Sequence, residues 1–164
     1  MTKAIFPGSF NPIHMGHIEI IYEASKVYDE VIVLVANNED KKYPVPLQVR
    51  TAIVEKAVQP INQKGNIKVQ YLEPGKTTPH FAKLVNCNTI VRGIKTKELP
   101  TYESALAESY LEINDSLEFH YFVITDMKTS STLVREAIKN TELKKGLVPE
   151  NVRREIEAEW KRVS

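Results

Sequence analysis

The sequence predicts a single doubly wound α/β domain over residues 1–164, built around a roughly five-stranded parallel sheet. One observation is that short β-branched runs alternate with segments whose apolar residues recur at helical spacing. A second is that no repeat, low-complexity tract or linker interrupts this alternation. A third is the composition, because 164 residues with 42% hydrophobic and 26% charged residues suit one globular domain with a sizeable core.

Five short apolar runs are expected to form the strands, since buried parallel strands are apolar along their whole length. These runs are residues 4–6, 31–36, 67–72, 89–91 and 119–124. Helical periodicity predicts six helices, at residues 17–25, 49–57, 81–85, 102–113, 130–139 and 149–163. Right-handed crossovers between parallel strands should place these helices on both faces of the sheet.

Loops that follow the carboxyl ends of the strands should meet at one rim of the sheet. They are residues 7–16, 37–46, 73–79, 93–100 and 125–130. Ligands of open α/β sheets bind at this rim. Because these loops hold most of the unusual polar residues of the chain, we expect the functional site there.

Charge and cysteine content narrow the classes of function. With 22 basic and 21 acidic residues the net charge is +1, so neither nucleic acid nor a membrane surface is an expected partner. Cys87 is the lone cysteine, which excludes an internal disulfide and a multi-cysteine metal site. No apolar stretch is long enough to span a bilayer, and the N-terminus has no signal-peptide pattern. We therefore expect a cytoplasmic enzyme or binding domain.

The opening segment, MTKAIFPGSFNPIHMGHIEI, predicts a phosphate site. Residues 4–6 lead into a glycine-containing turn with the hydroxyl of Ser9, and His14 and His17 lie where the next helix begins. A helix N-terminus favours anions, and imidazoles donate hydrogen bonds to phosphate. Helix capping and zinc binding are the alternatives for the two histidines. A zinc site needs a third protein ligand, and none stands nearby at a suitable spacing.

Two later segments add groups that bind phosphate. Ser130, Ser131 and Thr132 precede a predicted helix, with Arg135 one turn inside it. Simple N-capping accounts for one hydroxyl of this cluster, and not for the others with an arginine. Arg92 follows a predicted strand, where a guanidinium forks onto phosphate, although a solvated strand end is its alternative.

These segments together resemble the nucleotidyltransferase superfamily. Residues 8–17, GSFNPIHMGH, match its opening signature, and residues 129–136 match its (I)SSxxxR motif with threonine in place of isoleucine. The sequence VRG at 91–93, followed by Tyr102-Glu103, is similar to the phosphopantetheine adenylyltransferase family, as are the length and the closing VPENV. This resemblance implies a Rossmann-like fold and adenylyl transfer from ATP to 4′-phosphopantetheine, giving dephospho-coenzyme A and pyrophosphate in coenzyme A synthesis.

The resemblance also implies roles for individual residues. His17 and Lys41 would be catalytic, Glu103 would lie near the ribose of ATP, and Arg92 would hold the acceptor phosphate. The implied ATP-binding residues are Ser9, Phe10, His14, His17, Gly93, Glu103, Ser130, Ser131, Thr132 and Arg135. The implied acceptor-binding residues are Ser9, Lys41, Thr78 and Arg92.

Mg²⁺ is the expected cofactor, held by phosphate oxygens and water with no protein ligand assigned. ATP and a phosphate-bearing small molecule are the expected partners, and the family resemblance implies a homohexamer. Two alternatives stay open: a nicotinate or nicotinamide mononucleotide adenylyltransferase, and a non-catalytic nucleotide-binding domain of the same fold. A dehydrogenase is disfavoured because no G-x-G-x-x-G follows the first predicted strand.

The chain departs from the usual family pattern at several positions. Asn11 stands where the family usually has aspartate, and Lys95 stands where it usually has a second arginine. Residues 75–80 are more polar than the stretch expected beside a pantetheine arm, and residues 126–128 also differ. A lysine offers a single charge where an arginine offers two parallel hydrogen bonds, so Lys95 predicts weaker binding of the acceptor.

Overall fold

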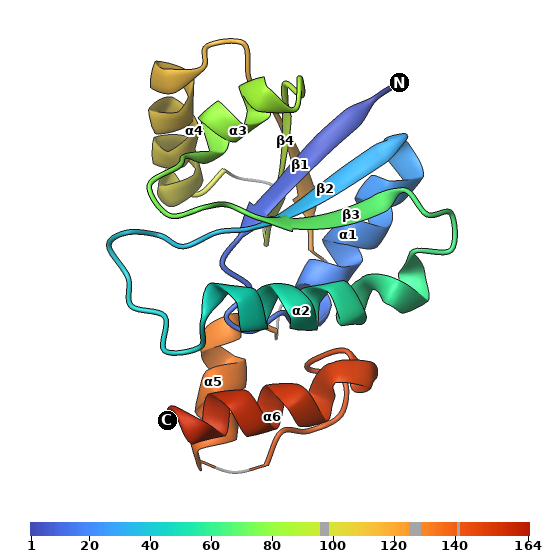
Figure 1. Cartoon of the computed structure of the whole chain (residues 1–164), viewed down its shortest axis with the longest axis vertical. Helices are drawn as coiled ribbons and strands as arrows, with labels where there is room; N and C mark the ends of the chain where they lie inside the picture. The colour runs from blue at the N-terminus through green and yellow to red at the C-terminus, as the bar shows by residue number, and fades with distance from the viewer. Residues whose placement is uncertain (96–98, 125–128, 141) are drawn as a thin grey trace.

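A computed structural model describes residues 1–95, 99–124, 129–140 and 142–164. The described residues form one parallel sheet with strand order β3-β2-β1-β4-β5 (Figure 1). The strands are β1 (Lys3–Gly8), β2 (Glu30–Val35), β3 (Ile67–Tyr71), β4 (Thr89–Ile94) and β5 (Glu118–Val123). Each predicted strand is therefore confirmed, with ends that differ by up to three residues.

The helices alternate with the strands as predicted. They are α1 (Met15–Val27), α2 (Leu47–Val58), α3 (Thr78–Leu84), α4 (Thr101–Ile113), α5 (Ser131–Asn140) and α6 (Arg153–Arg162). Two short 3₁₀ helices, η1 (Gln59–Ile61) and η2 (Glu150–Val152), accompany them. The prediction of one continuous helix over 149–163 was wrong. Val152 has φ −123° and ψ 4°, outside the helical region, so a 3₁₀ turn precedes α6.

The two faces of the sheet are covered by different helices (Figure 1). Ala4, Phe6 and Val33 belong to the core cluster that contains residues of α1, α2, α5 and α6. Ile5 and Ile32 are sequence neighbours of these residues and therefore point to the other face of the sheet. They belong to a smaller cluster that includes Ala82 of α3 and Leu117 before β5. Successive strand side chains point to opposite faces, so the continuous buried runs of β1 and β2 give the centre of the sheet two buried faces.

The strand order creates a switch point between β1 and β4. From β1 the chain builds outward through β2 and β3 on one side, and β4 and β5 extend the sheet on the other. Loops leaving β1 and β4 therefore diverge, which opens a crevice at their carboxyl ends. Of the predicted rim loops, residues 96–98 and 125–128 lie outside the described residues. Thr78 is the first residue of α3 rather than part of a loop.

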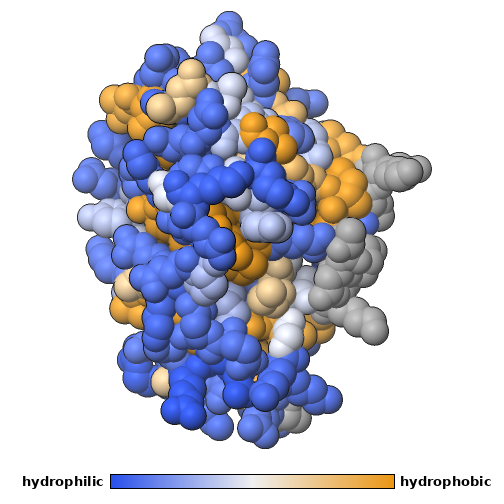
Figure 2. Space-filling view, turned by 90° about the vertical axis from the view of Figure 1, so that its right-hand side faces the viewer, coloured by the Kyte–Doolittle hydropathy of each residue, from blue (hydrophilic) through white to orange (hydrophobic). Residues whose placement is uncertain are grey.

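The surface is mainly hydrophilic on the face seen in Figure 2, with separate hydrophobic patches. No helix within the described residues is long and apolar enough to cross a membrane.

Candidate active site

A turn between β1 and α1 supplies the first wall of the crevice. Phe10 has a positive φ of 46° and is buried, and its ring lies 4.7 Å from the ring of His17. The Asn11–Pro12 peptide bond is cis. The side chain of Phe10 therefore packs against His17 and lines neither of the two cavities at this end of the sheet.

His14 and His17 form a reciprocal cap at the start of α1. The Nδ1 atom of His14 accepts a hydrogen bond from the Gly16 amide at 3.0 Å, and Nδ1 of His17 accepts from the His14 amide at 3.1 Å. An Nδ1 that accepts is unprotonated, so each neutral ring carries its proton on Nε2. A Cβ on residue 16 would lie 2.8 Å from Cε1 of His14, so the tight cap requires glycine.

Electrostatics keep His17 neutral at physiological pH. Burial, the neighbouring His14 and the positive charge of Arg92 together hold the pKa of His17 well below its usual 6.5. The histidine capping alternative from the sequence is confirmed as geometry. It does not compete with a ligand role, because the cap uses Nδ1 and leaves the Nε2–H of His17 as a hydrogen-bond donor.

Arg92 and Glu103 form a pair beneath the crevice. Nε of Arg92 donates to the Glu103 carboxylate at 3.0 Å, Nη2 donates at 2.8 Å, and Nη1 reaches the Pro7 carbonyl at 3.2 Å. Burial disfavours the charge of Arg92, but the Glu103 carboxylate outweighs it and raises the pKa of Arg92. A guanidinium has five N–H groups, so two remain for a phosphate after these three bonds.

The hydroxyl groups of Ser130, Ser131 and Thr132 have different partners. Ser130 accepts from the Leu133 amide at 3.1 Å, so it caps α5. Ser131 donates to the Pro12 carbonyl at 2.9 Å, and Nη1 of Arg135 donates to the Asn11 carbonyl at 2.8 Å. Nη2 of Arg135 also donates to Thr132 at 3.2 Å. The motif thus ties α5 to the turn after β1.

Arg50 is a site residue that the sequence interpretation missed. It is fully buried, and it donates to the carbonyls of Ser9 at 2.6 Å and Val45 at 3.0 Å, and to the side chain of Asn37. Its guanidinium also lies 4.5 Å from the ring centre of Tyr43. Burial lowers the pKa of Arg50. The sequence did indicate that Arg50 is buried, because helical spacing places it on the same face of α2 as Ile53 and Val54.

Arg50 consequently joins the turn after β1 to the loop after β2. That loop carries Lys41, which is exposed and lines both cavities at the rim. The larger cavity measures about 700 Å³ and the smaller about 450 Å³, and Ser9, Lys41 and Tyr43 line both.

Most of the sequence-predicted site residues are brought together by the larger cavity. It is lined by Ser9, His14, His17, Lys41, Thr78, Arg92, Gly93 and Ser130. Arg135 lines the smaller cavity, and Phe10, Glu103, Ser131 and Thr132 line neither. Phe10, Glu103 and Thr132 contact the lining residues His17, Arg92 and Arg135, whereas Ser131 is bonded to the Pro12 carbonyl, outside both cavities.

Within the part of the chain that the structure describes, no three His, Cys, Asp or Glu side chains are close enough to hold a metal ion. The acidic residues that line the larger cavity are Glu39 and Asp40, while Lys41, Lys76, Arg92 and Lys95 supply positive charge. This donor set suits an anionic ligand, and it suits a metal ion only if the ligand itself brings that ion.

Comparison with known proteins places this geometry in context. Residues 5–137 match the family model described as cytidylyltransferase-like. The chain is 35% identical over 158 residues to the phosphopantetheine adenylyltransferase of Finegoldia magna, with 94% of each chain covered. It is 36% identical over 162 residues to the phosphopantetheine adenylyltransferase of Bdellovibrio bacteriovorus, covering 93% of this chain and 94% of that one.

A solved structure from Vibrio parahaemolyticus, provisionally identified as a nicotinate-nucleotide adenylyltransferase, superposes with a TM-score of 0.67. The superposition covers 98% of this chain and 96% of that one, at 20% sequence identity. At that level of identity the likeness shows the Rossmann-like fold alone.

Proposed function

Because the chain belongs to the cytidylyltransferase-like family and, within it, to the phosphopantetheine adenylyltransferases, we propose that it transfers the adenylyl group of ATP to 4′-phosphopantetheine. The products are dephospho-coenzyme A and pyrophosphate, and the pathway is coenzyme A synthesis. The observation that carries the assignment to this site is the switch-point cavity, which is lined by His17, Lys41 and Arg92 together. The chain is a nucleotidyltransferase.

An oxygen of the acceptor phosphate attacks the α-phosphorus of ATP in line. The new bond joins that oxygen to the α-phosphorus, the bond to the bridging oxygen breaks, and pyrophosphate leaves with the electron pair. No protein nucleophile or base is required, because the attacking phosphate oxygen is already ionised. Catalysis therefore rests on positioning and on stabilising charge in the transition state.

His17 and Lys41 stabilise the α-phosphate of the transferring adenylyl group in different ways. His17 offers a neutral Nε2–H, held in that tautomer by the His14 amide, as a preorganised donor. Lys41 offers an exposed positive charge from the loop that Arg50 braces. Such a division needs no proton transfer from either residue.

Arg92 is suited to the acceptor phosphate through its two remaining N–H groups. Its pairing with Glu103 holds the guanidinium plane in one orientation, which favours hydrogen bonds of fixed direction to the acceptor phosphate. The implied ribose contact of Glu103 stays a prediction, because both carboxylate oxygens already accept from Arg92. A carboxylate oxygen has room for a second donor, so the two roles are compatible.

Mg²⁺ is the proposed cofactor. The cavity walls fit an ion held by triphosphate oxygens and water, in keeping with the reluctance of magnesium to lose its water shell. When bound, the ion supplies neutralising charge on the triphosphate. Cytoplasmic location and the absence of nucleic-acid and membrane partners stay predictions.

We propose a homo-oligomer from exposed apolar surface, and the hexamer is the form that the family resemblance implies. β5 is an edge strand, and Glu103 is the single buried residue of α4. Tyr102, Ile113 and Val123 leave 60%, 37% and 48% of their surfaces exposed. A second copy of the chain would cover these apolar groups and the unpaired strand edge. Light scattering after gel filtration should give six times the mass of the chain, and a monomer would contradict the proposal.

A substrate screen tests the function. The purified enzyme is incubated with ATP and Mg²⁺ together with 4′-phosphopantetheine, nicotinate mononucleotide or no acceptor, and pyrophosphate is measured. Pyrophosphate release is expected in the reaction with 4′-phosphopantetheine and in neither of the other two. Release with nicotinate mononucleotide alone would replace the proposed acceptor, and release with neither would favour a non-catalytic nucleotide-binding domain.

A further inference from the structure

The loop between β2 and α2, residues 36–46, carries Lys41, which lines the larger cavity. Residues 37–42 are all exposed, so the core does not cover this part of the chain. A charge on a loosely held loop has to be ordered each time a phosphate binds, and the lost conformational entropy weakens the interaction. The contacts that hold the loop therefore decide how well Lys41 is placed.

Residues 38–41 form a hydrogen-bonded turn inside this loop. The Lys41 amide donates to the Asn38 carbonyl at 2.9 Å, and the Asp40 amide donates to Oδ1 of Asn38 at 3.0 Å. An asparagine side chain that binds the amide two residues later is a common feature of tight turns. Both bonds are internal to the loop, so they shape the backbone at Lys41 without attaching it to the rest of the protein.

Tyr43 attaches this turn to a buried group. Its hydroxyl oxygen accepts from the Asn38 amide at 3.1 Å, and its ring centre lies 4.5 Å from the guanidinium carbon of Arg50. A guanidinium over the face of an aromatic ring is attracted by the ring electrons, more strongly when the pair is shielded from water. Tyr43 is half-buried and Arg50 is fully buried. One side chain thus binds the first residue of the turn and packs on a buried cation.

Arg50 is a rigid base for this contact. Its three nitrogens donate to the carbonyls of Val45 and Ser9 and to the side chain of Asn37, so the guanidinium plane has one orientation. The oxygens it meets are carbonyl and amide oxygens, none of which can rotate away as a surface carboxylate can. A ring that packs on this plane is therefore held in a defined place.

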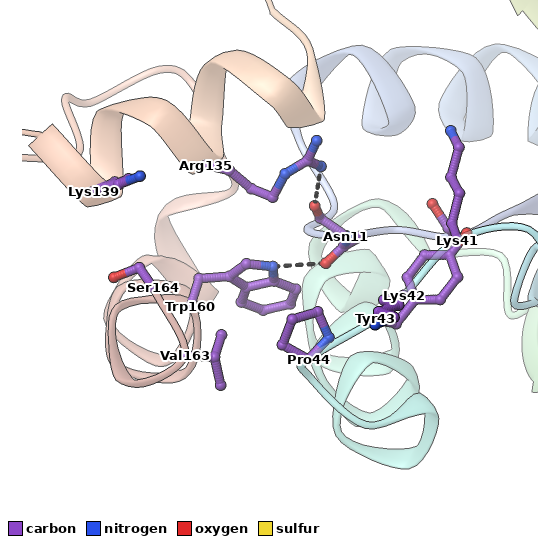
Figure 3. A pocket seen from close by; sticks show the side chains of 11 residues that line it. Asn11, Lys41, Lys42, Tyr43, Pro44, Arg135, Lys139, Trp160, Val163 and Ser164 are labelled. Atoms are coloured by element: carbon purple, nitrogen blue, oxygen red, sulfur yellow. Dashed lines mark hydrogen bonds between the residues drawn. The ribbon is translucent and has the colours of Figure 1, made fainter.

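Tyr43 consequently relates the turn at Lys41 to the turn after β1. Tyr43, Lys41 and Ser9 line both cavities, and Arg50 bonds the Ser9 carbonyl while it packs on Tyr43. Figure 3 shows the Lys41 side chain extending away from Pro44, on the loop that also carries Tyr43. The position of the Lys41 backbone thus depends on the same guanidinium that holds the opposite wall.

We propose that Tyr43 is a positioning residue for Lys41. Its ring on Arg50 and its hydroxyl on the Asn38 amide hold the 38–41 turn, so that the Lys41 ammonium meets the phosphate in one place. What Lys41 does there rests on the proposed function. Tyr43 acts through Lys41 and supplies neither charge nor a proton to the reaction.

Limited proteolysis of the free enzyme measures how firmly the turn is held. Trypsin cleaves after an exposed lysine once the backbone opens, so the rate of cleavage after Lys41 follows the open population of the loop. Tyr43→Leu should raise that rate by about tenfold, through loss of the ring contact and the hydrogen bond. Tyr43→Phe loses the hydrogen bond alone and should raise it by about threefold, and it tests the proposal even if Tyr43→Leu unfolds the chain.

Two controls separate the turn from the fold as a whole. Cleavage after Lys56, inside α2, reports general unfolding and should stay unchanged. Tyr22 is the matched tyrosine, because its ring also carries a cation, Nζ of Lys26 at 4.6 Å, and it lines neither cavity. Tyr22→Leu should leave cleavage after Lys41 at the wild-type rate. Unchanged cleavage after Lys41 in both Tyr43 variants would overturn the proposal, and so would an equal rise after Lys56.

Steady-state kinetics connect the turn to Lys41. Tyr43→Leu should lower kcat by about tenfold and Tyr43→Phe by about threefold, in the order of the cleavage rates. In a Lys41→Ala background, Tyr43→Leu should cause no further loss, because there is no ammonium left to position. Radiolabelled ATP keeps the slow turnover of that background measurable. An equal loss in both backgrounds would give Tyr43 a role independent of Lys41 and overturn the positioning claim.

Failure of this inference and failure of the proposed function give different results. If the wild-type chain releases no pyrophosphate with 4′-phosphopantetheine, the proposed function is refuted. Faster cleavage after Lys41 in the Tyr43 variants would then still show that Tyr43 holds the turn. If the enzyme turns over but the Tyr43 variants keep wild-type kcat despite faster cleavage, this inference is refuted and the proposed function stands.

Discussion

The His14 amide donates to Nδ1 of His17 at 3.1 Å, and the two imidazole rings lie 3.7 Å apart, centre to centre. This contact fixes the His17 tautomer and brings two ionisable groups together where one charge disfavours another. The same residue therefore caps α1 and, in the proposed mechanism, offers a neutral Nε2–H to the phosphate of ATP.

His17→Ala should lower kcat by on the order of 10²-fold or more, the scale for loss of one preorganised donor, with a smaller change in the KM for ATP. His17→Gln should retain more activity than His17→Ala, because its amide offers a neutral N–H. Steady-state kinetics at saturating substrates give the comparison. Near-normal kcat in a folded alanine variant would remove His17 from the mechanism.

The pH profile should reflect the lowered pKa of His17. Activity should stay level as pH falls from 8 to 6.5, where an unperturbed histidine would already be half protonated. Below 6.5 the unfolded chain binds a proton that the folded chain resists, so stability should decline as pH falls further toward the folded pKa of His17. NMR titration of the ring reports this value, and a midpoint at or above 6.5 would contradict it.

Arg92→Ala should raise the KM for 4′-phosphopantetheine at least tenfold, and much more than the KM for ATP, because one charge-assisted phosphate grip is lost. The substitution also leaves the buried Glu103 carboxylate without its partner. The double variant Arg92→Ala/Glu103→Ala is therefore the control for folding. A larger effect on ATP would place Arg92 at the triphosphate.

Arg50→Met should lower the free energy of unfolding by about 2–4 kcal/mol, since buried oxygens of Ser9, Val45 and Asn37 lose their donor. Urea denaturation followed by circular dichroism measures the loss. Arg154→Met, at an exposed position of α6, should change stability little. Equal midpoints for the two variants would show that Arg50 does not brace the site.

Gly93→Ala should destabilise the chain by about 1–3 kcal/mol through overpacking. A Cβ at residue 93 would lie 2.1 Å from Cδ1 of Ile20 and 3.2 Å from its Cγ1. Ile20→Val removes Cδ1, so the double variant should recover part of the loss. If Ile20→Val and Gly93→Ala destabilise additively, the clash is not the cause, and thermal melts of all four proteins distinguish these cases.

The local pattern of apolar residues in the sequence was enough to predict the strands and helices of this protein. Each of the five β-branched runs became a strand, since buried parallel strands need apolar residues on both faces and that need is visible in a short window. The grouping of Ser9, His14 and His17 at one cavity was also predictable, because these residues lie within a few positions of one another in the sequence. The break at Val152 was not, because the apolar period of residues 149–163 continues through the 3₁₀ turn.

Only the tertiary structure decided which groups meet. Arg50 reaches Ser9 across 41 residues, and Trp160 reaches Asn11 across 149. The sheet order and the packing of α2, α5 and α6 determine such partners, and neither is encoded in the spacing of neighbouring residues. The sequence by itself therefore determined the fold class, the family and most of the cavity lining. The fold decided the protonation of His17, the brace at Arg50 and the orientation of Asn11, because burial and hydrogen-bond partners arise only when distant elements come together.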